Sequence, residues 1–203
     1  MDAPLATVQP SAPPWPCPGR HLVLIGPMGA GKSTVGRQLS RLLRAPFVDL
    51  DERIERVTGA TIPLIFELEG EAGFRRRESE VLSEVLAQAE PQIIATGGGA
   101  VLAEANRAEL ARYGLMVYLR TPVELQLRRL ARDCKRPLLQ APDREQRLQR
   151  MAIERNPIYE ALAKVSIESG SDNPSRTARR LAQSQGWLPP CPTESDESPD
   201  EST

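Results

Sequence analysis

Residues 26–34 read Gly-Pro-Met-Gly-Ala-Gly-Lys-Ser-Thr and match the phosphate-binding pattern G-x-x-x-x-G-K-[ST]. The apolar run HLVLI at 21–25 precedes them and predicts a short buried strand. Apolar residues at helical spacing follow them, at Val35, Leu39, Leu42 and Leu43. Because a strand, a glycine turn and a helix succeed one another in this order, the stretch predicts a P-loop.

The residue types of this loop suit the phosphates of ATP. Its glycines permit backbone conformations in which successive N–H groups converge on one anion, and the following helix adds its N-terminal donors. We expect Lys32 to reach the β- and γ-phosphates, Ser33 to ligate Mg²⁺ and Thr34 to contact the α-phosphate. The ATP contacts expected from the loop come from Gly29, Ala30, Gly31, Lys32, Ser33 and Thr34. The alternative is an ordinary glycine turn with a solvated lysine.

Composition limits the kinds of partner. The 203 residues include 26 Lys and Arg against 27 Asp and Glu, which gives a formal net charge of −1 and favours neither nucleic acid nor a membrane surface. We therefore expect small-molecule partners and a monomer. Cys17, Cys134 and Cys191 lack the spacing of a disulfide framework or a zinc site. With no targeting signal at the start of the chain, a cytoplasmic protein is expected.

Two tails are expected to lie outside the fold. Residues 1–19 are rich in proline, and residues 189–203 combine proline with acidic side chains, so both are predicted to be disordered. A docking motif around Trp15 and Cys17 is the alternative for the first tail. The remaining residues, 20–188, are long enough for one domain of ordinary size.

Further strands are predicted at 46–51, 92–96, 115–119 and 164–168, each followed by a helical pattern. Asp49 and Asp51 end the first of these strands, and Gly97, Gly98 and Gly99 follow the second. Ligands of parallel α/β sheets gather beyond the carboxyl ends of the strands, where the P-loop also lies. A helix cap at Asp51 and a simple loop at the glycines are the structural alternatives. The alternation of strands and helices predicts a three-layer α/β P-loop kinase with a parallel sheet.

Two segments carry candidate binding residues. From 51 to 90 the pattern is helical and is divided by Gly59, Pro63 and Gly70. Arg76 and Arg77 of this segment are expected to face solvent. Thr121 and Pro122 are expected to open a helix as its cap and first residue. The proline-bounded segment at about 133–143 has no clean period and is a candidate lid. Helices are predicted at about 143–163 and 174–186.

Taken in order, six motifs closely resemble shikimate kinase over residues 21–185: GPMGAGKST, FVDLD, GEAGFRRRE, ATGGG, KRPLL and ERNPIYE. The resemblance implies transfer of the ATP γ-phosphoryl group to the 3-hydroxyl of shikimate, with Mg²⁺, toward chorismate and the aromatic amino acids. It also implies a nucleoside-monophosphate-kinase-like fold with five parallel strands in the order 2-3-1-4-5. The helical segment 51–90 would then bind the acceptor.

The resemblance also implies roles for single residues. Acceptor-binding positions match Asp51, Arg75, Gly97, Gly98, Gly99 and Arg155, and nucleotide or Mg²⁺ positions match Lys32, Ser33, Thr34, Asp49, Arg129 and Arg136. Lys32, Asp51 and Arg136 are the expected catalytic residues. Some members of the family place an arginine against the adenine near position 172, where this chain has Asp172.

Physical reasoning favours the same set. An acceptor with a carboxylate and vicinal hydroxyls needs planar cations and a carboxylate that faces a hydroxyl, and Arg75, Arg155 and Asp51 are of these types. Gluconate kinase and the nucleoside monophosphate kinases share the P-loop and lid, but the FVDLD and ATGGG pair argues against them. A nucleotide sensor without turnover is the alternative from another class, and the retained acceptor residues disfavour it.

Overall fold

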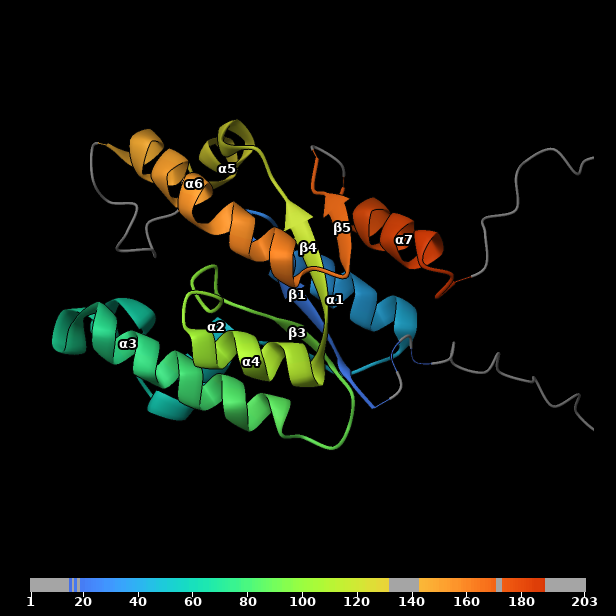
Figure 1. Cartoon of the computed structure of the whole chain (residues 1–203), viewed down its shortest axis with the longest axis horizontal. Coiled ribbons are helices and arrows are strands. Elements are labelled where there is room, and N and C mark those ends of the chain that lie inside the picture. The colour runs from blue at the N-terminus through green and yellow to red at the C-terminus, as the bar shows by residue number, and fades with distance from the viewer. Residues whose placement is uncertain (1–14, 16, 18, 132–142, 171–172, 189–203) are drawn as a thin grey trace, which may run out of the picture.

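A computed structural model describes residues 15, 17, 19–131, 143–170 and 173–188. Five parallel strands form one sheet in the order β2-β3-β1-β4-β5, which confirms the expected topology. The strands are β1 His21–Ile25, β2 Phe47–Asp49, β3 Ile93–Ala95, β4 Gly114–Arg120 and β5 Val165–Glu168. The described helices are α1 Lys32–Leu43, α2 Leu50–Thr58, α3 Ile62–Leu86, α4 Glu104–Tyr113, α5 Val123–Leu130, α6 Arg144–Leu162 and α7 Pro174–Ser184 (Figure 1).

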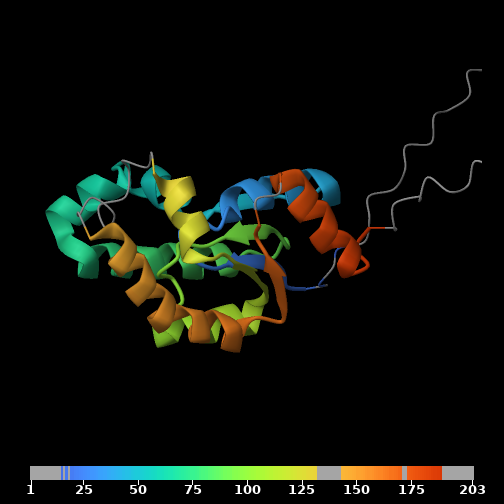
Figure 2. The same ribbon diagram turned by 90° about the horizontal axis from the view of Figure 1, so that it is seen from above.

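The central strand β1 serves two hydrophobic cores. Its side chains alternate between the two faces of the sheet, so that Val23 and Ile25 enter one core, and Leu22 and Leu24 enter the other. The first core receives α2, α3, α4 and α6, and the second receives α1 and α7. Figure 2 shows this layering, with α1 and α7 on one side of the sheet and α4 and α6 on the other. Every residue of β1 is buried, as expected of a strand covered on both faces.

The segment between β2 and β3 folds as two helices. Gly59 ends α2 with a positive φ of 67°, and Pro63 lies in the first turn of α3 rather than breaking it. Gly70 has φ 65° and ψ −174°, which kinks α3. Arg76 is mostly exposed, and Arg77, which forms an ion pair with Glu69 across this kink, is more than a third exposed, so both arginines contact solvent as expected.

Two local expectations are corrected at the starts of helices. β2 ends at Asp49, and Asp51 lies in the first turn of α2. Asp49 is the cap of this helix, because its carboxylate accepts hydrogen bonds from the backbone N–H groups of Asp51 and Glu52. At α5 the cap is Pro122 with no side-chain hydrogen bond, while the Thr121 hydroxyl turns back to the Leu119 carbonyl.

The end of the expected N-terminal tail packs on the second core. Trp15 and Cys17 lie against it together with Trp187, and Trp15 Nε1 donates to the Arg20 carbonyl at 2.8 Å. Burial raises the pKa of the Cys17 thiol to about 11. The proline density around these residues does not prevent an indole and a thiol from packing against the fold. Trp15 and Cys17 therefore contact the second core although both lie in the segment expected to be a tail.

We expect Trp15→Ala to lower the free energy of unfolding by about 2 kcal/mol, because it removes a partly buried indole and its hydrogen bond. Trp15→Phe keeps an aromatic ring but loses the bond to Arg20, so it should cost about 1 kcal/mol. Urea unfolding of both variants measures the two steps. Unchanged unfolding midpoints in both would show that this segment does not belong to the fold.

Candidate active site

The P-loop connects β1 to α1 and uses its glycines as the sequence predicts. Gly26, Gly29 and Gly31 have φ values of 139°, 75° and 86°, a region that other residues rarely adopt. Gly31 is the N-cap of α1, and no side chain caps this end of the helix. The first turn of α1 is therefore open to an anion supplied by a ligand.

Lys32 lies above the loop. Its ammonium group donates to the carbonyls of Gly26 and Pro27, both at 2.8 Å, and the residue is only 8% exposed. These contacts fix a buried positive charge next to the backbone at the start of the P-loop. A phosphate bound there would meet a cation as well as backbone donors.

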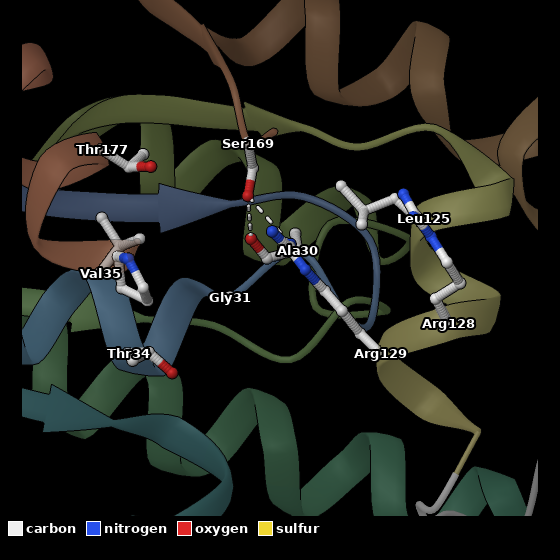
Figure 3. A pocket seen from close by; sticks show the side chains of 10 residues that line it. Ala30, Gly31, Thr34, Val35, Leu125, Arg128, Arg129, Ser169 and Thr177 are labelled. Atoms are coloured by element: carbon white, nitrogen blue, oxygen red, sulfur yellow. Dashed lines mark hydrogen bonds between the residues drawn. The ribbon is translucent and has the colours of Figure 1, made fainter. Parts of the chain in front are cut away.

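A cavity of about 420 Å³ opens beside the loop (Figure 3). It lies between the start of α1 and side chains from α5, the end of β5 and α7. Its lining comprises Ala30, Gly31, Thr34, Val35, Leu125, Arg128, Arg129, Ser169, Pro174 and Thr177. The cavity thus extends from the phosphate loop past apolar and cationic side chains, as a nucleotide site requires.

Arg129 lies at the edge of this cavity and contacts the P-loop. Its Nη1 donates to the Gly29 carbonyl at 2.9 Å and to the Ser169 hydroxyl at 3.0 Å, and its Nη2 donates to the Gly170 carbonyl. Burial, with a smaller contribution from Arg128, lowers the pKa of Arg129 below its ordinary value. The structure therefore places this candidate nucleotide residue beside the loop, as the sequence leads us to expect.

A second group of polar residues surrounds the glycine turn after β3. A Cβ atom added to Gly97 would lie 2.4 Å from Glu78 Oε1 and 3.2 Å from Asp51 Oδ1, so both carboxylates face this glycine. A Cβ atom on Gly99 would lie 2.3 Å from Arg75 Nη1. A side chain at Gly97 or Gly99 would displace Glu78 or Arg75 from the turn, which supplies a physical reason for glycine at these two positions.

The half-buried Arg75 pairs with the buried Glu78 at this turn. Arg75 Nη1 donates to Glu78 Oε2 at 2.7 Å, and its Nη2 donates to the more exposed Glu71 at 3.1 Å. Glu78 is 1% exposed, and its Oε1 has no hydrogen-bond partner among the described residues. Burial raises the pKa of the Glu78 carboxyl, although the arginines at 75 and 155 oppose the shift.

The sequence interpretation missed Glu78. Its only signal was the spacing of three residues from Arg75 in the run FRRRE, which places the two side chains on one face of a helix. That spacing is common on solvent-exposed helices. Only the packing of α3 against the glycine turn shows that this glutamate is buried.

Arg155 approaches the same group from α6. It is 7% exposed, its Nε lies 3.9 Å from the Glu154 carboxylate, and that nitrogen has no hydrogen-bond partner in the described part of the chain. Tyr159, one turn further along α6, donates its hydroxyl hydrogen to the Gly98 carbonyl. This bond ties α6 to the turn and leaves a buried guanidinium with donor capacity beside it.

The remaining candidates separate into two cases. Asp49 and Ser33 lie at the beginnings of α2 and α1, on the edge of the sheet that also carries the P-loop. Arg136, Asp172 and most of the candidate lid fall outside the described residues. No group of three or more potential metal-ligating side chains is present within the described ranges, and no helix within them is both long and apolar enough to cross a membrane.

The fold and these two adjoining sites define a P-loop kinase that phosphorylates a small acceptor. The family model described as "Shikimate kinase" matches residues 28–185. The chain is 51% identical to a shikimate kinase of Methylococcus capsulatus, over 80% of this chain and 90% of the relative. It is 49% identical to one of Halorhodospira halophila, over 83% and 94%.

A solved shikimate kinase from Acinetobacter baumannii, in complex with shikimate, superposes with a TM-score of 0.78 at 49% identity, covering 81% of this chain and 91% of that one. The chain belongs to the shikimate kinase family. Its activity is the ATP-dependent phosphorylation of shikimate, a step of aromatic biosynthesis.

The raised pKa of Glu78 predicts a measurable pH dependence. Glu78 keeps its proton to higher pH in the folded state than in the unfolded state. Its contribution to the free energy of unfolding is therefore fully present below the unfolded pKa of about 4.3 and is lost as pH rises through the folded pKa. Glu78→Gln cannot titrate, so the stability of wild type relative to this variant should fall as pH rises from about 4 to 7. Urea unfolding across this range tests the sign, and parallel stability curves would contradict it.

Proposed function

We propose that this chain transfers the γ-phosphoryl group of ATP to the 3-hydroxyl of shikimate across the glycine turn at 97–99. One observation carries the proposal. A Cβ atom on Gly98 would lie 3.3 Å from the backbone nitrogen of Met28 in the P-loop, while the glycines on either side of it face the carboxylates and Arg75. The glycine turn therefore borders both the P-loop and the acceptor site. This proximity suits direct transfer of a phosphoryl group between two bound substrates.

Arg75 and Arg155 would bind the acceptor carboxylate. The buried Arg155 has an Nε donor that lacks a partner among the described residues, and both arginines lie close enough to Glu78 to affect its pKa. A planar anion placed between two guanidinium groups can accept charge-assisted hydrogen bonds from both. The backbone of the glycine turn would support the carbon ring at close range.

Asp51 would orient the accepting hydroxyl and take its proton as the phosphorus–oxygen bond forms. Its carboxylate faces Gly97, next to the expected phosphate position. Lys32 would stabilise the oxygens of the transferred group because its ammonium already lies over the loop. Thr34 and Arg129 would bind the nucleotide in the cavity, and Arg136 would add a second cation.

Mg²⁺ fits the donor set. It commonly binds through one or two protein oxygens together with water and substrate phosphates, rather than in a cage of side chains. Ser33 offers a hydroxyl at the start of α1, and Asp49 offers a carboxylate, directly or through water, at the end of β2. The ion would neutralise charge on the β- and γ-phosphates.

We further propose that the protein acts as a monomer in the cytoplasm, and that ATP and shikimate are its small-molecule partners.

The acceptor can be tested by following ATP consumption with shikimate, gluconate, AMP or no acceptor in parallel. We expect ATP to be consumed in the presence of shikimate, but not with gluconate, with AMP or without an acceptor. Lys32→Ala should abolish it, because the variant loses the cation that meets the developing charge, while its thermal midpoint stays near that of wild type. Consumption driven by gluconate or AMP, or near-normal kcat in Lys32→Ala, would overturn the assignment.

Asp51→Asn should lower kcat by roughly 10²- to 10⁴-fold, the usual range for loss of a general base. The amide keeps the size of the side chain and some hydrogen bonding, so KM for shikimate should change much less. Glu52→Gln is the matched control, because it removes the neighbouring carboxylate in the same helical turn, where it pairs with Arg37 at the surface. A loss below tenfold in Asp51→Asn would make Asp51 a binding residue only.

A further inference from the structure

Ser169 follows the last residue of β5 and joins three parts of the nucleotide site. Its backbone N–H donates to the Arg120 carbonyl at 2.7 Å, which extends the pairing of β5 with β4 by one residue. Its side-chain hydroxyl donates to the carbonyl of Ala30 in the P-loop, also at 2.7 Å. The residue is 3% exposed, so water does not compete freely for these bonds.

The same hydroxyl oxygen accepts a hydrogen bond from Arg129 Nη1 at 3.0 Å (Figure 3). A serine hydroxyl has one hydrogen to donate and lone pairs to accept. The two contacts therefore use complementary capacities of one atom: the hydrogen goes to Ala30, and a lone pair receives Arg129. The nitrogen that reaches Ser169 also donates to the Gly29 carbonyl at 2.9 Å, so the arginine is fixed from two sides.

The bond to Ala30 determines how a phosphate-binding donor is aimed. The Ala30 carbonyl and the Gly31 N–H belong to one planar peptide unit, and in a trans peptide they point in opposite directions. None of the described peptide bonds is cis. When Ser169 holds the Ala30 carbonyl on its own side, the Gly31 N–H is turned away from Ser169 and remains available to a ligand in the loop.

This restraint matters because Gly31 has φ 86° and caps α1. Glycine visits many backbone conformations at little cost, so the peptide before it can rotate unless another group holds it. Ala30 is fully buried, and its carbonyl would lose this hydrogen bond if the Ser169 hydroxyl were removed.

We propose that Ser169 is a positioning residue for the nucleotide: one hydroxyl fixes the 30–31 peptide of the P-loop and the guanidinium of Arg129 at the same time. The inference rests on the proposed use of this cavity for ATP. It assigns no contact between Ser169 and the reacting atoms. Its effect is to organise the site in advance, so its loss should weaken nucleotide binding and leave the acceptor site unaffected.

The test compares Ser169→Ala with Ser169→Thr, which restores a hydroxyl. ADP affinity is measured by calorimetry on the full chain without Mg²⁺ or shikimate, and KM is measured for ATP and for shikimate. We expect Ser169→Ala to weaken ADP binding about three- to tenfold and to raise KM for ATP by a similar factor. KM for shikimate should stay within about twofold, and Ser169→Thr should recover most of the ADP affinity.

Ser40→Ala is the matched control. Its hydroxyl also donates to a backbone carbonyl, that of Ala45 at 2.6 Å, but at the far end of α1 from the cavity. It should lower the thermal midpoint as Ser169→Ala does, without changing ADP affinity. Equal ADP affinity in wild type and Ser169→Ala, equal losses in Ser169→Ala and Ser40→Ala, or no recovery in a folded Ser169→Thr would each overturn the inference. Failure of wild type to bind ADP would instead contradict the proposed function of the cavity.

Discussion

The close approach of two backbone segments, the P-loop and the glycine turn after β3, is the constraint on which this structure depends. Gly98 lies against the backbone of Met28 and Gly26, and a Cβ atom there would contact both. Because β1 and β3 pair in parallel, the two segments that follow them lie next to each other at the carboxyl ends of the strands. A side chain at this position would push the two segments apart by a few tenths of an ångström or more. In the proposed function, the distance between donor phosphate and acceptor hydroxyl would therefore depend on main-chain packing.

Charge burial is the second requirement, because four ionisable side chains, Asp51, Arg75, Glu78 and Arg155, lie around this turn. The half-buried Arg75 compensates the buried Glu78, whereas Arg155 Nε and Glu78 Oε1 have no hydrogen-bond partner among the residues that the structure describes. Desolvated groups of this kind cost stability in the free protein. In the proposed function, the carboxylate and hydroxyl groups of the acceptor would become partners of these groups, so part of the binding free energy would come from relieving that cost. Such a site would discriminate against ligands that lack either group.

Patterns with a local cause were sufficient to predict the P-loop and the alternation of strands and helices, and the resemblance to shikimate kinase supplied the sheet order that the structure confirms. The P-loop is defined by glycine positions that require positive φ, and the buried strands by runs of apolar residues. What failed depended on tertiary packing. Glu78 is buried because α3 packs against the glycine turn. The strand β2 ends two residues earlier than expected, so Asp49 rather than Asp51 caps α2. The prolines around Trp15 gave no sign that this residue packs on the core. The bridge made by Ser169 joins residues 139 positions apart and leaves no local signature.

The division of the interior by β1 has an evolutionary consequence. The proposed acceptor residues on α2 and α3 rest on one hydrophobic core, while the start of α1 and α7, which line one side of the cavity, rest on the other. The opposite side of the cavity is formed by α5, which packs on α6 through a third, smaller cluster around Leu130 and Leu148. Substitutions in the first core beneath α2 and α3 therefore offer evolution a route to a new acceptor that leaves the α1 and α7 side of the cavity in place.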